Sequence, residues 1–363
     1  MNAELMRIVD SISRDKNIDK ESVIADLESA IVSAARKKYG QDEDVTCAID
    51  RITGDMSVLR NGLPVDLKEL GRIPAQTAKQ VMIQKLREAE RGSIFEEFNE
   101  RKGQIVTGSV SRFEGGALVV NLGRTEGFLP KSEQIPGETH HPGDRIRALI
   151  LDVREMPHQV KIVLSRSHPD FIRRLFELEV PEVAERIIEI KALAREAGYR
   201  TKIAVSSIDS KVDAVGACVG VRGSRIKNIV DELGGEKIDI VRWNESSQIL
   251  ITNALKPAEI QEIALCFELG RATVVVAEDQ LSLAIGKRGQ NVRLAARLTG
   301  WDIDILTPAE YNKGLDDMVN TLKSVEGIED VVIDKLIAMG IISLMDLEAV
   351  SYTHLTLPTI YSV

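Results

Sequence analysis

The sequence contains few cysteines and no long apolar run. Its three cysteines lie far apart in 363 residues and follow neither a CxxC spacing nor a Cys/His ligand spacing, so we expect no disulfide framework and no metal site. No window of eighteen apolar residues exists, and the amino-terminal segment lacks the apolar core of a signal peptide. The sequence therefore predicts a cytoplasmic protein that does not contact a membrane.

Aromatic side chains and positive charge are also scarce. Two Trp, five Tyr and seven Phe are too few for a protein built around base-stacking platforms. A formal net charge of −9 also disfavours nucleic-acid binding by the chain as a whole. The charge is uneven, however, because residues 101–166 carry ten basic and seven acidic side chains, whereas residues 309–363 carry three and nine. We therefore expect nucleic-acid contacts in the middle of the chain, made by backbone and groove more than by stacking.

The length predicts two or three domains, and changes in hydrophobic period divide the chain further. Residues 1–102 are expected to be mostly helical. The expected elements are an opening helix near residues 8–12, a helix over 20–39 ended by Gly40, short strands at 47–49 and 57–59, and a long helix from Pro74 to about Gly103. Residues 103–168 then alternate like about five strands, which is the size of a small OB barrel.

The most informative feature is an internal repeat with a period of 66 residues. Gly220-Val221-Arg222-Gly223 and Gly286-Lys287-Arg288-Gly289 occupy matching places in two units, residues 169–242 and 243–308. Each unit is expected to hold a helix (181–198 or 257–267), a strand, a short helix, the Gly-x-x-Gly loop, a longer helix and a final strand. Such a repeat indicates two copies of one module.

Each Gly-x-x-Gly loop has the properties of a phosphate site. Glycines allow a tight turn and the close approach of another backbone. Helices that begin at Ser224 and Gln290 would point free amide groups toward the loop, which favours phosphate. KH domains use such a loop to clamp about four nucleotides of single-stranded nucleic acid. A single loop fits an ordinary helix-turn-helix connection equally well, but two copies in matched settings favour KH modules of the type II arrangement.

The expected RNA-contacting residues are the two loops and the cations of the helices that follow them. They are Gly220, Val221, Arg222, Gly223, Arg225, Lys227, Gly286, Lys287, Arg288, Gly289, Arg293 and Arg297. No catalytic residue is expected, because the sequence holds no Walker A loop and no Asp/His cluster.

An S1-type OB barrel followed by two such modules resembles the NusA family of bacterial transcription factors. The resemblance covers residues 1–350 and includes the segments AIVSAARKKYG, GRTEGFLPKSEQIPGE, VLSRSHPDF, VGACVGVRGSRI and IGKRGQNVRLAARLTGW. It implies a multidomain α+β chain. The implied parts are a helical N-terminal α/β domain (1–102), an S1-type OB-fold β-barrel (103–168), two tandem type II KH domains and a short acidic helix-hairpin-helix-like segment (309–350).

The resemblance also implies an elongation factor without a cofactor that modulates pausing, termination and antitermination. Its implied partners are nascent single-stranded RNA, core RNA polymerase through the β flap and the α C-terminal domain, and other Nus antitermination factors. We expect a monomer. Two alternatives remain: an RNA-binding accessory module of an RNA-processing enzyme, and a translation-side RNA-binding regulator.

Three segments depart from this pattern or leave it open. The positions where S1 domains usually carry an aromatic residue and a histidine hold Gly116 and Pro130, while Phe113 and Phe128 fall at positions typical of apolar core. Arg112, Lys131 and Arg166 are expected to be electrostatic RNA contacts or solvated charges. The acidic segment is expected to bind polymerase, to mask the KH surface or to form a small helical cap. Residues 351–363 carry no charge and are expected to be non-native.

Overall fold

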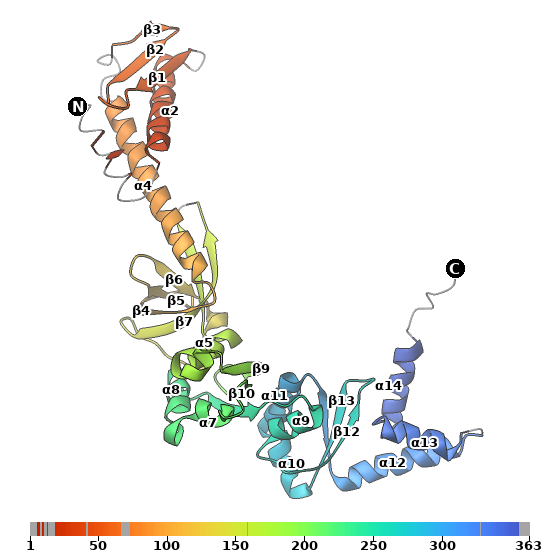
Figure 1. Cartoon of the computed structure of the whole chain (residues 1–363). Helices are drawn as coiled ribbons and strands as arrows, with labels where there is room; N and C mark the ends of the chain where they lie inside the picture. The colour runs from red at the N-terminus through yellow and green to blue at the C-terminus, as the bar shows by residue number, and fades with distance from the viewer. Residues whose placement is uncertain are drawn as a thin grey trace. The chain divides into compact units, whose positions relative to one another are not determined.

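The structure is a computed structural model. It describes residues 6–7, 9–10, 13, 19–40, 43–66, 73–157, 159–326 and 328–355. Contacts divide the chain into two compact units, which are Met1–Gln104 with Ser111–Phe128 and Ile150–Leu164, and Ile105–Val110 with Leu129–Leu149 and Ser165–Val363. No helix in the described ranges has the length and apolar content needed to cross a bilayer. The fold class expected from the sequence, a multidomain α+β chain, is confirmed (Figure 1).

The amino-terminal part packs helices on a small sheet. Helix α2 (Lys20–Tyr39) begins where Asp19 accepts a hydrogen bond from the Ser22 amide and ends at Gly40, as predicted. Its buried side chains lie with those of the β-sheet in one core, formed by Val23, Ile24, Leu27, Ile31, Ala35, Val45, Ile49 and Val58 among others. The other elements are β1 (Val45–Ile49), β2 (Met56–Arg60), β3 (Leu63–Pro64) and α4 (Ile73–Glu100). Of the expected opening helix, residues 9–10 are helical, whereas Ile8 and Ile12 lie outside the described residues.

Five strands then form a closed barrel in the order β4-β5-β6-β8-β7, which confirms the expected barrel. The apolar alternation predicted by the sequence is clearest in β8, where buried and partly exposed positions alternate from Val160 to Leu164. The strands are β4 (Ile105–Glu114), β5 (Ala117–Asn121), β6 (Glu126–Leu129), β7 (Arg145–Glu155) and β8 (Val160–Ser165).

Two modules of the same topology follow, each with a three-stranded mixed sheet. The first comprises α5 (Pro169–Glu179), α6 (Pro181–Ala184), β9 (Ile188–Glu196), β10 (Arg200–Ser207), α7 (Ala214–Val219), α8 (Ser224–Glu232) and β11 (Lys237–Arg242). The second comprises α9 (Ser247–Leu255), β12 (Ile260–Cys266), β13 (Arg271–Val276), α10 (Glu278–Ile285), α11 (Gln290–Thr299) and β14 (Asp302–Leu306). In both, the middle strand pairs antiparallel with the first strand and parallel with the last.

One sequence prediction about these modules is wrong. The helices expected over 181–198 and 257–267 are mainly strands, because β9 and β12 occupy these segments. Glu, Ala, Lys and Arg favour helix by intrinsic propensity, but pairing with the neighbouring strand outweighs so weak a preference. The first helix of each module lies earlier, as α5 and α9.

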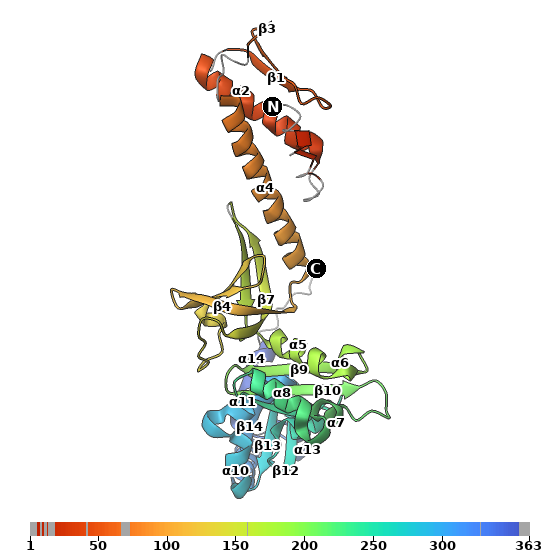
Figure 2. The same cartoon turned by 90° about the vertical axis from the view of Figure 1, so that its left-hand side faces the viewer.

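The sheet of the first module is buried on both faces. Ile203 and Val205 of β10 lie in a core with α5, α7 and α8 of the same module. The neighbouring Ala204 lies instead in the core of the second module, together with side chains of α9 and α11. Figures 1 and 2 both show α11 beside β9 and β10, and these elements are in contact. The helices of the second module therefore cover the sheet face that the first module leaves open.

Three carboxy-terminal helices pack against β13 and the β12–β13 turn of the second module. They are α12 (Pro308–Lys323), α13 (Asp330–Ala338) and α14 (Leu344–Leu355). Cys266, at the end of β12, is buried in a cluster with Met318, Leu322, Ile333, Ile341 and Val350. Arg271 of β13 donates a 2.7 Å hydrogen bond to the buried carboxylate of Asp346. The acidic segment is thus anchored on the second module.

A Gly-Ile pair, Gly340-Ile341, lies in the connection between α13 and α14, whereas Gly327 of a second such pair lies outside the described residues. Helix α14 continues past residue 350 to Leu355, although no helix was expected there. Residues 356–363 lie outside the described residues, and their non-native origin stays a prediction.

We expect Gly340→Ala to lower the free energy of unfolding by about 1–3 kcal/mol, the usual cost of overpacking. Gly340 has a φ of +80°, and an added Cβ would lie 2.3 Å from the Leu265 carbonyl oxygen. Gly270→Ala is the matched control, because Gly270 also has positive φ (+61°) but nothing within 4 Å of a Cβ. Urea unfolding of both variants measures the difference, and equal losses would contradict the role of the contact.

Candidate nucleic-acid interface

The two Gly-x-x-Gly loops have nearly the same backbone geometry. Gly220 and Gly223 have φ values of 75° and 76°, and Gly286 and Gly289 have 74° and 72°. The third residue of each loop, Arg222 or Arg288, is also left-handed, with φ of 52° and 54°. In both loops the amide of the last glycine donates a 3.1 Å hydrogen bond to the carbonyl of the first. The repeat seen in the sequence therefore produces two equivalent structures.

The two glycines of each loop meet different requirements. An added Cβ at Gly220 would lie 2.8 Å from Cγ of Arg225, and one at Gly286 would lie 2.8 Å from Cβ of Asn291. The first glycine is therefore required by close packing within the module. A Cβ at Gly223 or Gly289 would meet no atom closer than 3.8 Å. The space beside the last glycine is open, which suits the approach of a ligand backbone.

Both loops lead directly into a helix whose amino terminus has no side-chain cap. Helix α8 begins at Ser224 and α11 at Gln290, as predicted, and their N-cap residues are the loop glycines Gly223 and Gly289. Glycine offers no side-chain acceptor to the helix amides. The free amides expected at Ser224 and Gln290 are not observed, because these two groups donate to the carbonyls of Val221 and Lys287 within the loops. The helix amino terminus still favours an anion through its dipole.

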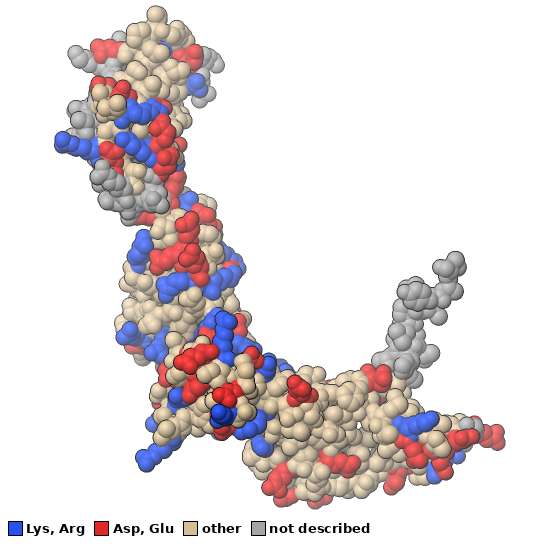
Figure 3. Space-filling view, in the orientation of Figure 1, with Lys and Arg blue, Asp and Glu red and all other residues tan. Residues whose placement is uncertain are grey.

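The exposed cations of this surface surround the loops. Val221 is 82% exposed, and Arg222, Lys227, Lys287, Arg288 and Arg297 are exposed as well. In the part of the chain that the structure describes, none of these five cations has an ion pair within 4 Å. On the face shown in Figure 3 the charge around α10 is acidic, in agreement with Glu278 and Asp279 in its first turn. The loop and α11 hold four of the second module's basic residues, Lys287, Arg288, Arg293 and Arg297.

Arg225 is already engaged within its own module. Its Nη1 donates to the Ala217 carbonyl at 2.7 Å and to Oε2 of Glu182 at 2.8 Å. The equivalent residue of the second module is Asn291, which is 1% exposed and donates to the carbonyls of Leu283 and Ala284. Both side chains hold the last turn of the helix that precedes the loop. The sequence prediction did not single out Asn291, although its place 66 residues after Arg225 is a usable signal.

Arg293 is also engaged, by a carboxylate of the other module. Its Nε donates to Oε1 of Glu196 at 2.6 Å, and the side-chain amide of Gln290 donates to Oε2 of Glu196 at 2.8 Å. The hydrogen bond from Arg293 is the main cause of the lowered pKa of Glu196. Sequence reasoning missed Glu196, because it lies 97 residues from Arg293 in a segment expected to be helical.

Fewer cationic side chains of the barrel are available for RNA contacts than expected. Arg112 is bound by Glu126, with Nη1 and Oε1 2.6 Å apart, whereas Lys131 is exposed. Phe113 is 55% exposed and so does not occupy the apolar core position expected for it. The ammonium of Lys161 lies 4.9 Å from the centroid of the Phe128 ring.

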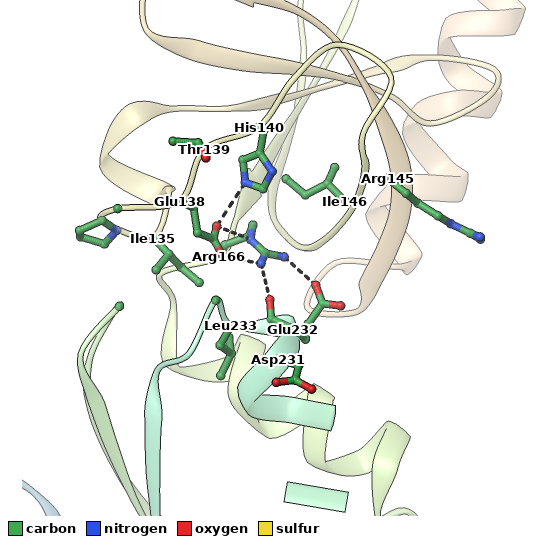
Figure 4. A pocket seen from close by; sticks show the side chains of 14 residues that line it. Ile135, Glu138, Thr139, His140, Arg145, Ile146, Arg166, Asp231, Glu232 and Leu233 are labelled. Atoms are coloured by element: carbon green, nitrogen blue, oxygen red, sulfur yellow. Dashed lines mark hydrogen bonds and ion pairs between the residues drawn. The ribbon is translucent and has the colours of Figure 1, made fainter. Parts of the chain in front are cut away.

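Arg166 is not the RNA contact or solvated charge that was expected. It is 3% exposed and lies at a pocket of about 570 Å³ between the segment after β6 and the end of α8 (Figure 4). Its guanidinium donates to both carboxylate oxygens of Glu138 and to the carboxylate and carbonyl of Glu232. His140 lies 3.3 Å from Glu138 in the same network. A buried, fully paired arginine fixes the first module to this part of the barrel.

Comparison with known proteins identifies the four domain types. The family model for a NusA-like first KH domain matches residues 166–243, and the model for a NusA-like second KH domain matches 247–313. The NusA N-terminal domain matches 4–66 and 61–92, and the S1 RNA binding domain matches 100–167.

Curated relatives match along most of the chain. The transcription termination/antitermination protein NusA of Halalkalibacterium halodurans is 42% identical over 342 aligned residues, and the match covers 85% of this chain and 90% of that protein. The chain belongs to the NusA family. The NusA protein of Bacillus subtilis is 42% identical and covers 84% of the chain, with 91% of its own length matched. The NusA protein of Rickettsia conorii is 41% identical and covers 86%, with 69% of its own length matched.

Within this NusA-family chain, Arg225 and Lys227 should respond differently to truncation. Arg225→Ala removes the hydrogen bonds to the Ala217 carbonyl and to Glu182, so we expect a loss of about 1–3 kcal/mol in the free energy of unfolding. Lys227→Ala should change stability by less than about 0.5 kcal/mol while weakening RNA binding. Thermal unfolding and fluorescence anisotropy with single-stranded RNA measure both effects. A stable Arg225→Ala variant with weakened RNA binding would contradict the structural role of Arg225.

Proposed function

We propose that this chain is a transcription elongation factor that binds RNA polymerase and nascent single-stranded RNA and so modulates pausing, termination and antitermination. The observation that carries the proposal is the pair of equivalent Gly-x-x-Gly loops, each with an open last glycine, exposed central residues and an uncapped helix behind it. The relatives named as termination/antitermination proteins support a role of this surface in transcription.

In the proposed mechanism, the loop of each module binds RNA phosphates and the groove beside it binds bases. Phosphates bind at the loop, where exposed cations and the positive end of the helix dipole coincide, and these contacts position the strand without reading its sequence. Bases lie against the groove beside the loop, as in KH domains generally. Val221, Arg222, Lys287 and Arg288 are the side chains that we assign to the RNA, with Lys227 and Arg297 as flanking phosphate contacts. Arg225 and Arg293 act mainly through the protein.

Partners and domain limits complete the proposal. Residues 1–102 would bind core RNA polymerase at the β flap, and 103–168 would orient the two KH domains (169–242 and 243–308) toward emerging RNA. The acidic segment 309–350 would bind the polymerase α C-terminal domain, and other Nus factors would join the complex. We propose a cytoplasmic monomer that is not an enzyme.

The two alternative functions that the sequence left open predict different partners. A module of an RNA-processing enzyme requires a catalytic partner domain, and a translation-side regulator predicts no affinity for RNA polymerase. The match of residues 4–92 to the NusA N-terminal domain favours the transcription side.

Electrostatic binding predicts a definite response to salt. With about 4–6 phosphate contacts, the slope of log K against log salt should be about −3 to −4 for single-stranded RNA. The double substitutions Val221→Asp with Arg222→Asp, and Lys287→Asp with Arg288→Asp, should each lower affinity and leave thermal unfolding unchanged, since these side chains are exposed. A slope near zero, or intact affinity in both double variants, would reject the assignment of the loops.

Polymerase binding should depend on the amino-terminal part. We expect the full chain to retain core RNA polymerase in a pull-down and a chain without residues 1–100 to lose it while keeping its RNA affinity. Retention by the truncated chain would instead favour a polymerase contact elsewhere, and no retention by the full chain would favour the translation-side alternative.

A further inference from the structure

The end of strand β9 joins the first KH domain to its neighbours on both sides. Side chains alternate between the two faces of a strand, so Arg195 and Glu196 point in opposite directions. Arg195 donates to the carbonyls of Arg166 and His168, at 2.7 and 3.0 Å, on the side of the first domain's own helices. Glu196 points to the second KH domain, where it accepts hydrogen bonds from Gln290 and Arg293.

The backbone that carries Glu196 is rigidly held. Arg195 forms a buried ion pair with Glu236, and the two side chains are 1% and 0% exposed. Glu236 also accepts hydrogen bonds from the amide of Gly198, within the β9–β10 turn, and from the hydroxyl of Thr201 in β10. A fully satisfied buried network of this kind fixes the local geometry. The Glu196 carboxylate is therefore presented from a fixed point of the first domain.

The two groups that Glu196 binds belong to the first turns of α11. Gln290 is the first residue of this helix and follows the last glycine of the second loop directly, and Arg293 also donates to the carbonyl of Arg288 within that loop. Helix α11 packs on β9 through small side chains, Ala192 and Ala194. Such a smooth surface brings the helix close but leaves rotation and sliding weakly restrained. The hydrogen bonds of Glu196 supply a directional restraint at the loop end of the helix.

We propose that Glu196 of the first KH domain is a positioning residue that sets the orientation of the second Gly-x-x-Gly loop, so that one RNA strand engages both loops together. Rigid linkage of two binding sites raises the effective concentration of the second site once the first is bound. Glu196 thus acts through Gln290 and Arg293 and does not touch the RNA. This inference rests on the proposed RNA binding by both loops.

The test measures how RNA affinity grows with RNA length. Oligoadenylates of about 5 to 20 nucleotides are titrated against the full chain, since one KH loop clamps about four nucleotides. The variants are Glu196→Ala, Glu196→Gln and Gln290→Ala. The matched control is Glu177→Ala, which removes the same charge from a pair with Arg174 that lies within a single helix.

We expect the wild type and the control to gain affinity as the RNA becomes long enough to reach both loops. In Glu196→Ala this gain should fall by about threefold to tenfold, because the two sites lose part of their effective concentration. Glu196→Gln should keep most of the gain, since its amide oxygen still accepts a hydrogen bond. Gln290→Ala should reduce the gain as well. Combining it with Glu196→Ala should reduce the gain little further, because both substitutions remove the same hydrogen bond between Gln290 and Glu196.

Two results would overturn the proposal. An unchanged length gain in Glu196→Ala and Gln290→Ala would show that apolar packing alone orients the loop. An equal rise in affinity for short and long RNA in Glu196→Ala would show that Glu196 only repels phosphate. If Glu196→Ala fails to fold, Gln290→Ala and Glu196→Gln still give the comparison. Failure of the proposed function is a separate result, in which the wild type itself binds no RNA of any length.

Discussion

The packing of α9 and α11 on the open face of the β9–β11 sheet is the contact on which the candidate interface depends. Without it the two KH domains would be separate binders joined by a short connection. With it, Ala204 of the first domain lies in the core of the second, and the helix behind the second loop rests on β9. The loops therefore belong to one body, and their relative position is a property of a hydrophobic core reinforced by a few charged hydrogen bonds.

Charge plays two distinct roles in this chain. Arg166, Arg195 and Arg225 are engaged by carboxylates and carbonyls of the protein, and each holds one structural element against another. Arg222, Lys227, Lys287 and Arg288 remain exposed around the loops. A net charge of −9 is compatible with RNA binding because the acidic residues are elsewhere, notably in the carboxy-terminal helices, or already neutralise an internal arginine.

The sequence predicted local structure and motifs better than it predicted partners. Helix 20–39, the barrel strands and both loops carry strong local signals, such as the stop at Gly40 and the glycines that require positive φ. Strands β9 and β12 were mistaken for helices because their composition favours helix, and pairing with the next strand, β10 or β13, outweighs that preference. The roles of Arg166 and Glu196 were equally inaccessible. Their partners lie up to 97 residues away, and nothing local separates a buried arginine from a solvated one.

The open face of the first KH sheet is covered by helices that follow it in the chain. This order has a consequence during synthesis on the ribosome. The sheet of the first KH domain is complete at Arg242, but the helix that covers its open face ends only at Thr299. At bacterial elongation rates the ribosome needs roughly 3–12 seconds to add the residues between these two points, and the face stays uncovered during that time. On this face the first domain contributes three alanines together with Val241 and Trp243, whereas the leucine and isoleucine side chains of the interface arrive with α9 and α11. The apolar surface that the unfinished chain exposes is therefore smaller than the surface that later covers it.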